Sequence, residues 1–75
     1  NPNPVEEELT LYLGETLRGN TMVSIYNTKG QRIYNKSFFG DWKIIELNVD
    51  KYKKGYYLLD VDHNHRKGSL KFIKK

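Results

Sequence analysis

Apolar side chains recur at every second position along most of this chain. Tyr57, Leu59 and Val61 show the pattern most clearly, after a sharp turn that Gly55 makes possible. Residues two apart share one face of a strand, so this period predicts strands with one buried face. The other predicted inward positions are Leu9, Leu11 and Leu13, then Val23 and Ile25, then Ile45, Leu47 and Val49, and finally Leu70 and Phe72. We therefore predict six strands and no helix.

Turn-forming residues separate the predicted strands. The stretch Asn27 to Gly30 predicts a type I turn with glycine in the left-handed position, so residues 22–38 should form a β-hairpin. The adjacent Phe38 and Phe39 predict a bulge or a change of facing at the far end of that hairpin. Three further connections are predicted at residues 14–20, at Gly40-Asp41 and at residues 62–68.

A corner precedes the clearest strand. The spacing Tyr52-x-x-Gly55-x-Tyr57 resembles the tyrosine corner of β-sandwiches, in which a tyrosine hydroxyl bonds back to the backbone just upstream. Strands, short turns and this corner together predict an all-β chain, arranged as a small antiparallel sandwich or a partly open barrel.

The length of 75 residues allows one small domain. Such a domain buries only about 60–65% of the surface that its unfolded chain exposes, so its stability should be modest. The chain begins with Asn rather than Met, and Asn1 to Pro4 has the composition of a linker. We therefore expect a boundary at residues 1–4, a domain at residues 5–75, and an origin as the C-terminal piece of a longer protein.

Composition and charge limit the kinds of site and of partner that this chain can have. The chain has no cysteine, which excludes disulfides and thiolate sites, and no apolar run has the length of a membrane span. Residues 1–50 carry five Lys/Arg and seven Asp/Glu, whereas residues 51–75 carry eight Lys/Arg and two Asp/Glu. The basic end could meet nucleic acid, acidic polysaccharide or an acidic protein groove, or its lysines could simply keep a small sheet soluble and guard its edges.

Groups that could hold a metal gather around one predicted loop. His63 and His65 are two positions apart, so on an extended backbone they could point toward one ion, with Asp60 or Asp62 as a third ligand. The alternative is a solvated turn between the last two strands. We favour the solvated turn and expect no metal, because the sequence has no second cluster of ligands.

Other chemistry has little support. Glu6 to Glu8 predicts a solvated start of a strand rather than a carboxylate pair, and no glycine-rich phosphate loop is present. Tyr56 and Phe72 with the terminal lysines could stack on nucleic acid, but so small a core needs its aromatic residues. No nucleophile elbow surrounds any of Ser24, Ser37 and Ser69. We therefore expect no enzyme and no nucleic-acid partner.

Several short motifs follow one another in a familiar order. They are Asn3-Pro4, Leu9-Thr10-Leu11, Val23 to Asn27 ahead of Gly30-Gln31, Leu47-x-Val49, Gly55-x-Tyr57, and Lys71 to Lys74 near the end. In this order and spacing, the whole chain resembles the C-terminal sorting domain (type A) of type IX secretion cargo in Bacteroidetes-type bacteria.

The resemblance implies a function in addressing. Members of the family are immunoglobulin-like β-sandwiches, here of about six to seven short strands, fused to secreted proteins. They direct their cargo from the periplasm through the type IX outer-membrane translocon, with a shuttle protein, and a cell-surface sortase typically cleaves them off. The cargo is then attached to anionic lipopolysaccharide or released, so it is secreted or stays at the cell surface. The domain itself would need no cofactor and would be a monomer or weak dimer.

The resemblance also assigns residues. The sorting signal falls on the tail Lys71, Phe72, Ile73, Lys74 and Lys75, and the motif that builds the fold falls on Asn3, Pro4, Gly30, Gln31, Gly55 and Tyr57. We expect the two glycines to serve backbone geometry. The tail could be a basic edge strand that a partner reads by strand addition, with Lys71 and Lys74 for selection, or merely the last strand of the domain.

Two features depart from the family pattern. Tyr52 stands where leucine is frequent, and Lys53-Lys54 stands where Pro-Ser or similar is frequent, which makes this turn more basic. The loop from His63 to Gly68 matches no motif, so the resemblance gives its histidines no role.

A second function stays open from the residues alone. A surface adhesive or carbohydrate-binding sandwich, appended to a larger exported enzyme, would use exposed aromatic rings as stacking platforms. Tyr12, Tyr56 and Trp42 are the candidates.

Overall fold

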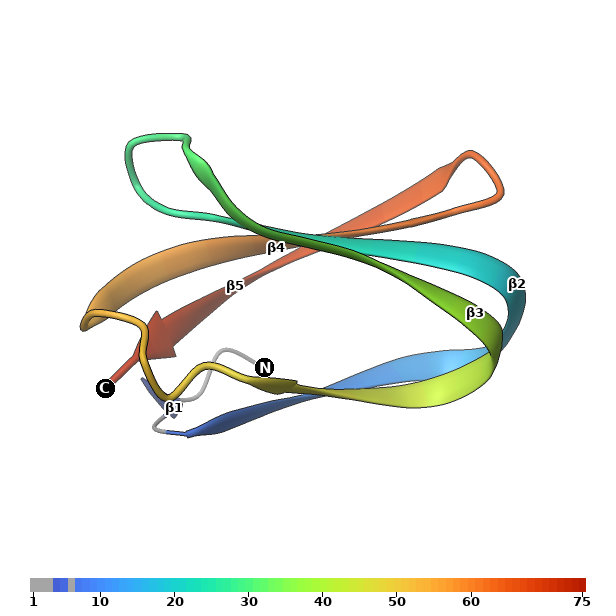
Figure 1. The fold of residues 1–75 in the computed structure, drawn as a ribbon, viewed down its shortest axis with the longest axis horizontal. Coiled ribbons are helices and arrows are strands. Elements are labelled where there is room, and N and C mark those ends of the chain that lie inside the picture. Colours follow the sequence, from blue (N-terminus) through green and yellow to red (C-terminus); the bar gives the residue numbers. More distant parts are fainter. Residues whose placement is uncertain (1–3, 6) are drawn as a thin grey trace.

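The structure, a computed structural model, describes residues 4–5 and 7–75, with side chains from Glu7 onward. Its five strands are β1 (Pro4–Val5), β2 (Glu8–Tyr26), β3 (Arg32–Asn48), β4 (Gly55–His63) and β5 (Arg66–Lys74). They form one sheet in the order β1-β5-β4-β2-β3, in which β1 is parallel to β5 and all other pairs are antiparallel (Figure 1). The all-β prediction is confirmed. No helix capable of crossing a membrane occurs among the described residues.

Five strands stand where six to seven were predicted. Two predicted connections lie inside strands, which merges the six strands of the sequence pattern into four, and the short β1 is the fifth. β2 continues through residues 14–20, and β3 continues through Gly40-Asp41. These two segments lie opposite each other, with Gly19 paired to Gly40. Their polar, glycine-containing sequences predicted loops, but residues 17–20 of β2 stay paired with residues 39–42 of β3, so the ribbon does not leave the sheet.

The β2–β3 ribbon folds back on itself at this point (Figure 1). We call residues 8–13 of β2 with residues 44–48 of β3 the lower arm, and the remainder of both strands with β4 and β5 the upper arm. The register shifts between the pairs Tyr12–Ile44 and Leu17–Trp42, because β2 has extra residues there. Such bulges bend and twist a ribbon. One bent sheet therefore stands where the separate sheets of an immunoglobulin-like sandwich were predicted.

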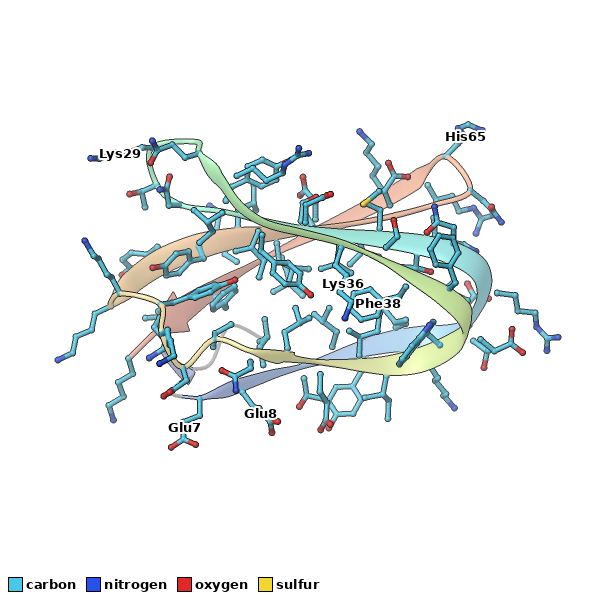
Figure 2. All side chains as sticks on the ribbon, viewed as in Figure 1. Glu7, Glu8, Lys29, Lys36, Phe38 and His65 are labelled. Atoms are coloured by element: carbon cyan, nitrogen blue, oxygen red, sulfur yellow. The ribbon has the colours of Figure 1, made fainter. Side chains whose placement is uncertain are left out.

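Apolar side chains from both arms fill the space between them (Figure 2). The buried set is Leu9, Leu11, Val23, Ile25, Phe38, Ile45, Leu47, Val49, Tyr57, Leu59 and Phe72. The alternation of the sequence predicted these inward faces correctly. Three predicted inward residues, Leu13, Val61 and Leu70, are only partly buried.

The predicted bulge or change of facing at Phe38 and Phe39 is wrong, because the two side chains follow the ordinary alternation of a strand. Phe38 is 8% exposed and Phe39 is 73% exposed, while both keep a regular register with β2. The irregularity of this hairpin lies instead at Ile33, which the pairs on either side skip. The Lys36 ammonium lies 5.1 Å from the centre of the Phe38 ring (Figure 2).

The predicted polar loop at residues 62–68 is a two-residue turn. β4 extends to His63 and β5 begins at Arg66, and these two residues face each other. Asn64 and His65 between them have φ values of 50° and 65°, as in a type I′ hairpin turn. Polar residues on the exposed face of a hairpin gave the sequence a loop-like composition, although the backbone stays paired.

This turn predicts a stabilising substitution. Replacing His65→Gly should raise the free energy of unfolding by about 0.5–1 kcal/mol, because glycine adopts positive φ without the steric cost of a side chain. The urea midpoint of the chain measures the effect. His65→Ala, which keeps a Cβ, is the control and should give no gain. A lower midpoint for the glycine variant would contradict the turn assignment.

Candidate functional site

Three landmarks of the predicted signal meet at one end of the upper arm. These are the hairpin turn after β2, the start of β4 and the end of β5 (Figure 1). Tyr26 on β2 faces Leu58 on β4, which in turn faces Lys71 on β5. A shallow hollow of about 260 Å³ lies among them. Its lining is Asn27, Thr28, Tyr56, Tyr57, Leu58 and Lys71.

The hairpin turn owes its shape to Asn27. Its side-chain oxygen accepts hydrogen bonds from the backbone N–H groups of Lys29 at 2.9 Å and Gln31 at 3.0 Å. Its amide nitrogen donates to the Gln31 side-chain oxygen at 2.8 Å, and its carbonyl accepts from the N–H of Gly30 at 3.0 Å. Gly30 has φ +81°, and an added Cβ would meet nothing, so its requirement is conformational alone.

These contacts give both motif residues of this turn a physical role. Gly30 supplies the left-handed backbone. The side-chain oxygen of Gln31 accepts a hydrogen bond from the Asn27 amide and so holds the Asn27 side chain in place. The turn prediction is confirmed. Sequence reasoning missed the importance of Asn27, although asparagine at the start of a turn is a known signal for side-chain bonding to the backbone.

The tyrosine corner is confirmed, with Tyr57 as the bonding residue. Its hydroxyl donates to the carbonyl oxygen of Lys53 at 2.6 Å. Its ring stacks on Phe72 with centroids 5.3 Å apart, and the Tyr52 ring lies tilted against the Tyr57 ring, also with centroids 5.3 Å apart. Burial, with the nearby Tyr34 and Tyr57 hydroxyls, raises the pKa of Tyr52. Tyr57 therefore ties the turn before β4 to the last strand of the sheet.

The tail is divided between inward and outward residues. Phe72 is fully buried and Lys74 is 7% exposed, with its ammonium donating to the carbonyl oxygen of Lys75 at 3.4 Å. Lys71 and Lys75 are exposed. The cations open to a partner are thus Lys71 and Lys75, whereas Lys74, which we had predicted as a selecting residue, faces inward.

The predicted free edge at the tail is partly covered. β1 pairs with the last residues of β5, Pro4 with Ile73 and Val5 with Lys74. Backbone pairing already takes up this part of the edge, so a partner could add a strand here only by displacing β1. The Asn3 half of the predicted Asn-Pro motif, like Glu6 of the acidic run, lies outside the described residues.

The histidines do not converge. The ring of His63 has Nδ1 at 3.1 Å from the carbonyl oxygen of Asn20 and at 3.2 Å from the hydroxyl of Thr21, and Nε2 at 3.2 Å from the amide of Asn64. His65 points away from the protein at the turn (Figure 2). Both nitrogens of His63 already have partners, and the contacts of Nδ1 connect the end of β4 to the part of β2 next to the bend.

The two carboxylates considered as metal ligands, Asp60 and Asp62, have different neighbours. Asp60 accepts a hydrogen bond from the Ser69 hydroxyl at 2.7 Å, and Asp62 faces Lys67 across the hairpin. Within residues 7–75, no three His, Cys, Asp or Glu side chains are placed to hold an ion. Glu7 and Glu8 point outward from the lower arm (Figure 2).

The aromatic candidates for sugar stacking do not form one platform. Tyr12 is 78% exposed on the lower arm, and Tyr56 is 63% exposed on the upper arm. Trp42 packs edge-on against Phe38, with centroids 5.4 Å apart, and its indole N–H donates to the carbonyl oxygen of Phe39 at 3.0 Å. Trp42 is therefore partly committed to the core near the bend.

Comparison with known proteins agrees with the arrangement of these motifs. A family model described as the secretion system C-terminal sorting domain matches residues 1–75. The chain belongs to this family. The resemblance to the type IX secretion C-terminal sorting domain is thereby confirmed. A comparison with curated proteins gave no match.

Membership carries several consequences for the sorting domain. It is a type IX sorting signal that interacts with the secretion system, and its cargo is exported to the cell surface or beyond. The hairpin turn, the corner and the tail share one hollow in the structure. In the sequence they are far apart, with 44 positions between Asn27 and Lys71.

Removing the corner bond should weaken the sorting domain. Tyr57→Phe deletes the hydroxyl that bonds to Lys53 and should lower the free energy of unfolding by about 0.5–1.5 kcal/mol. Urea denaturation measures the loss. Tyr56→Phe, on the exposed neighbouring ring, is the matched control and should change nothing. Equal losses in both variants would show that the corner bond adds no stability.

The Asn27 side chain should contribute most of the stability of the hairpin turn. Asn27→Ala removes three side-chain hydrogen bonds and should cost about 1–2 kcal/mol of unfolding free energy. Gln31→Ala removes one of them and should cost less, while the exposed Thr28→Ala serves as the control. Thermal melting of the three variants gives the ranking, and a larger loss for Gln31→Ala than for Asn27→Ala would refute it.

Proposed function

We propose that this domain is the address of a fused cargo protein. It directs the cargo from the periplasm across the outer membrane through the type IX translocon, handed on by a shuttle protein. A cell-surface sortase then cleaves the domain off, and the cargo is attached to anionic lipopolysaccharide or released in Bacteroidetes-type bacteria. The domain is a substrate and a ligand in these steps and carries out no catalysis itself.

The observation that carries this proposal is the shared hollow at the end of the upper arm. A signal that is read as one unit needs its parts close together and fixed relative to one another. The Asn27 turn network, the Tyr57 corner and the stacked Phe72 hold them in this way. Exposed Tyr56, Leu58 and Lys71 then present an apolar and basic surface to a partner.

The charge of this region supports an acidic partner surface. Residues 51–75 have eight Lys/Arg against two Asp/Glu, and Lys71 and Lys75 are exposed among them. Surface charges of one sign speed the encounter with an oppositely charged partner. Lys71 lies at the lining of the hollow, so it is the cation that a partner seated there would contact.

Export of a fusion tests the proposal. Residues 1–75 joined to a periplasmic reporter should place the reporter outside the cell in a type IX-competent host and leave it in the periplasm of a translocon-deficient strain. Lys71→Glu should lower export about tenfold, equivalent to ~1.4 kcal/mol of lost recognition. Lys43→Glu, an exposed residue of β3, is the matched control.

Deleting the whole tail would be a poorer test, because Phe72 is fully buried and its loss would unfold the domain. Full retention of the intact wild-type fusion in the periplasm would refute the proposed function. Equal export of wild type and Lys71→Glu would refute the role given to Lys71.

A further inference from the structure

The two arms of the folded sheet differ in width. The upper arm has β3, β2, β4 and β5 side by side, whereas the lower arm has only β2 and β3. The inner face of the wider arm is closed near the tail, where Phe72 and Leu59 are fully buried. Toward the β4–β5 turn, Val61 and Leu70 stay partly exposed. The core is therefore left open on one side.

A cleft of about 790 Å³ occupies this open side. One wall is the lower arm and the bend, including Leu13 and Leu17, and the other is the inner face of β4 and β5, including Val61 and Leu70. The volume lies in the range of ~300–1,000 Å³ that is usual for ligand pockets. Apolar side chains line part of each wall and can receive the apolar side chains of an occupant, while polar and charged side chains line the remainder.

The cleft runs along an unpaired strand edge. β2 pairs with β3 along most of its length, but within residues 7–75 its other side is paired with β4 only from Thr21 onward. The edge from Glu8 to Gly19 thus keeps backbone N–H and C=O groups without a strand partner, which is a template for strand addition. A strand added there would become the third strand of the lower arm and would cover Val61 and Leu70.

The rim of the cleft is mainly basic and favours an occupant with negative charge. Arg18, Arg66 and Lys67 line it, opposed by the single carboxylate of Glu15. A strand with carboxylates near Arg66 and Lys67 would therefore be favoured. A second copy of this chain is disfavoured in the register centred between Leu11 and Tyr12, because antiparallel pairing there would set Glu8 of one copy against Glu15 of the other.

We propose that the secretion machinery engages this domain by adding an extended strand to the free edge of β2, with alternate apolar side chains in the cleft and carboxylates at Arg66 and Lys67. This inference rests on the proposed function and assigns it a docking surface distinct from the hollow at Lys71. It also moves strand addition from the tail, where β1 covers the end of β5, to an edge that is open.

A synthetic strand tests the cleft directly. The probe is acetyl-Asp-Val-Thr-Val-Thr-Val-Asp-amide, compared with the same peptide carrying lysine in place of aspartate. The acidic peptide should bind the 75-residue chain at least about tenfold more tightly, a difference of ~1.4 kcal/mol. Amide hydrogen exchange should slow at residues 8–13. The double variant Arg66→Glu/Lys67→Glu should remove the preference.

Three results of this experiment would overturn the inference. They are equal binding of the two peptides, protection confined to the outer edge of β5, and protection of residues 8–13 that rises with protein concentration alone. The last result would show that a second copy occupies the edge.

Export of the fusion separates this inference from the proposed function. Arg66→Gln/Lys67→Gln, which places no carboxylate opposite Asp62, should reduce export about tenfold without changing the melting temperature, again ~1.4 kcal/mol. Arg32→Gln/Lys43→Gln, with the same charge change at exposed positions of β3, should export normally. If the wild type is exported and the cleft variant is exported equally well, the docking surface is wrong and the sorting function stands. If the wild type is not exported, the sorting function falls, and the peptide measurement still decides the cleft.

Discussion

The whole fold depends on the β2–β3 ladder staying paired through its bend. A two-stranded ribbon with one apolar face cannot bury that face while it is straight, and isolated hairpins are marginal in water. By folding back, the ribbon sets Leu9 and Leu11 against Val23 and Ile25 and so covers its own apolar side. β4 and β5 then extend the upper arm and supply Tyr57 and Phe72 to the same core.

The sequence predicted what depends on local pattern. Period-two alternation identified the inward residues, and the spacing around Gly55 identified the corner that Tyr57 makes. Whether a glycine-rich polar stretch leaves a sheet depends on what lies opposite it. Residues 14–20 and Gly40-Asp41 look like two independent loops in sequence, yet Gly19 faces Gly40 and together they form one bend. The pairing of these two segments joins distant parts of the chain, so the pattern within one strand could not predict it.

The candidate site shows the same division. The motif residues were found from their order along the chain, but their shared hollow depends on strand order. Burial of Lys74 also could not be predicted from composition, since a lysine stem can lie inward with its head at the boundary of the protein. His63 gave no sequence signal for its bonds to Asn20 and Thr21, because those partners lie 43 and 42 positions away.

The short parallel pairing of β1 with the end of β5 has a topographic consequence. Pro4 lies beside Ile73, about one interstrand spacing of ~4.8 Å away. The first strand of the described chain therefore lies beside the end of the last strand and runs in the same direction. Two residues 69 positions apart in the chain are thus neighbours, so a ligand that binds around the end of β5 would meet the start of the domain as well.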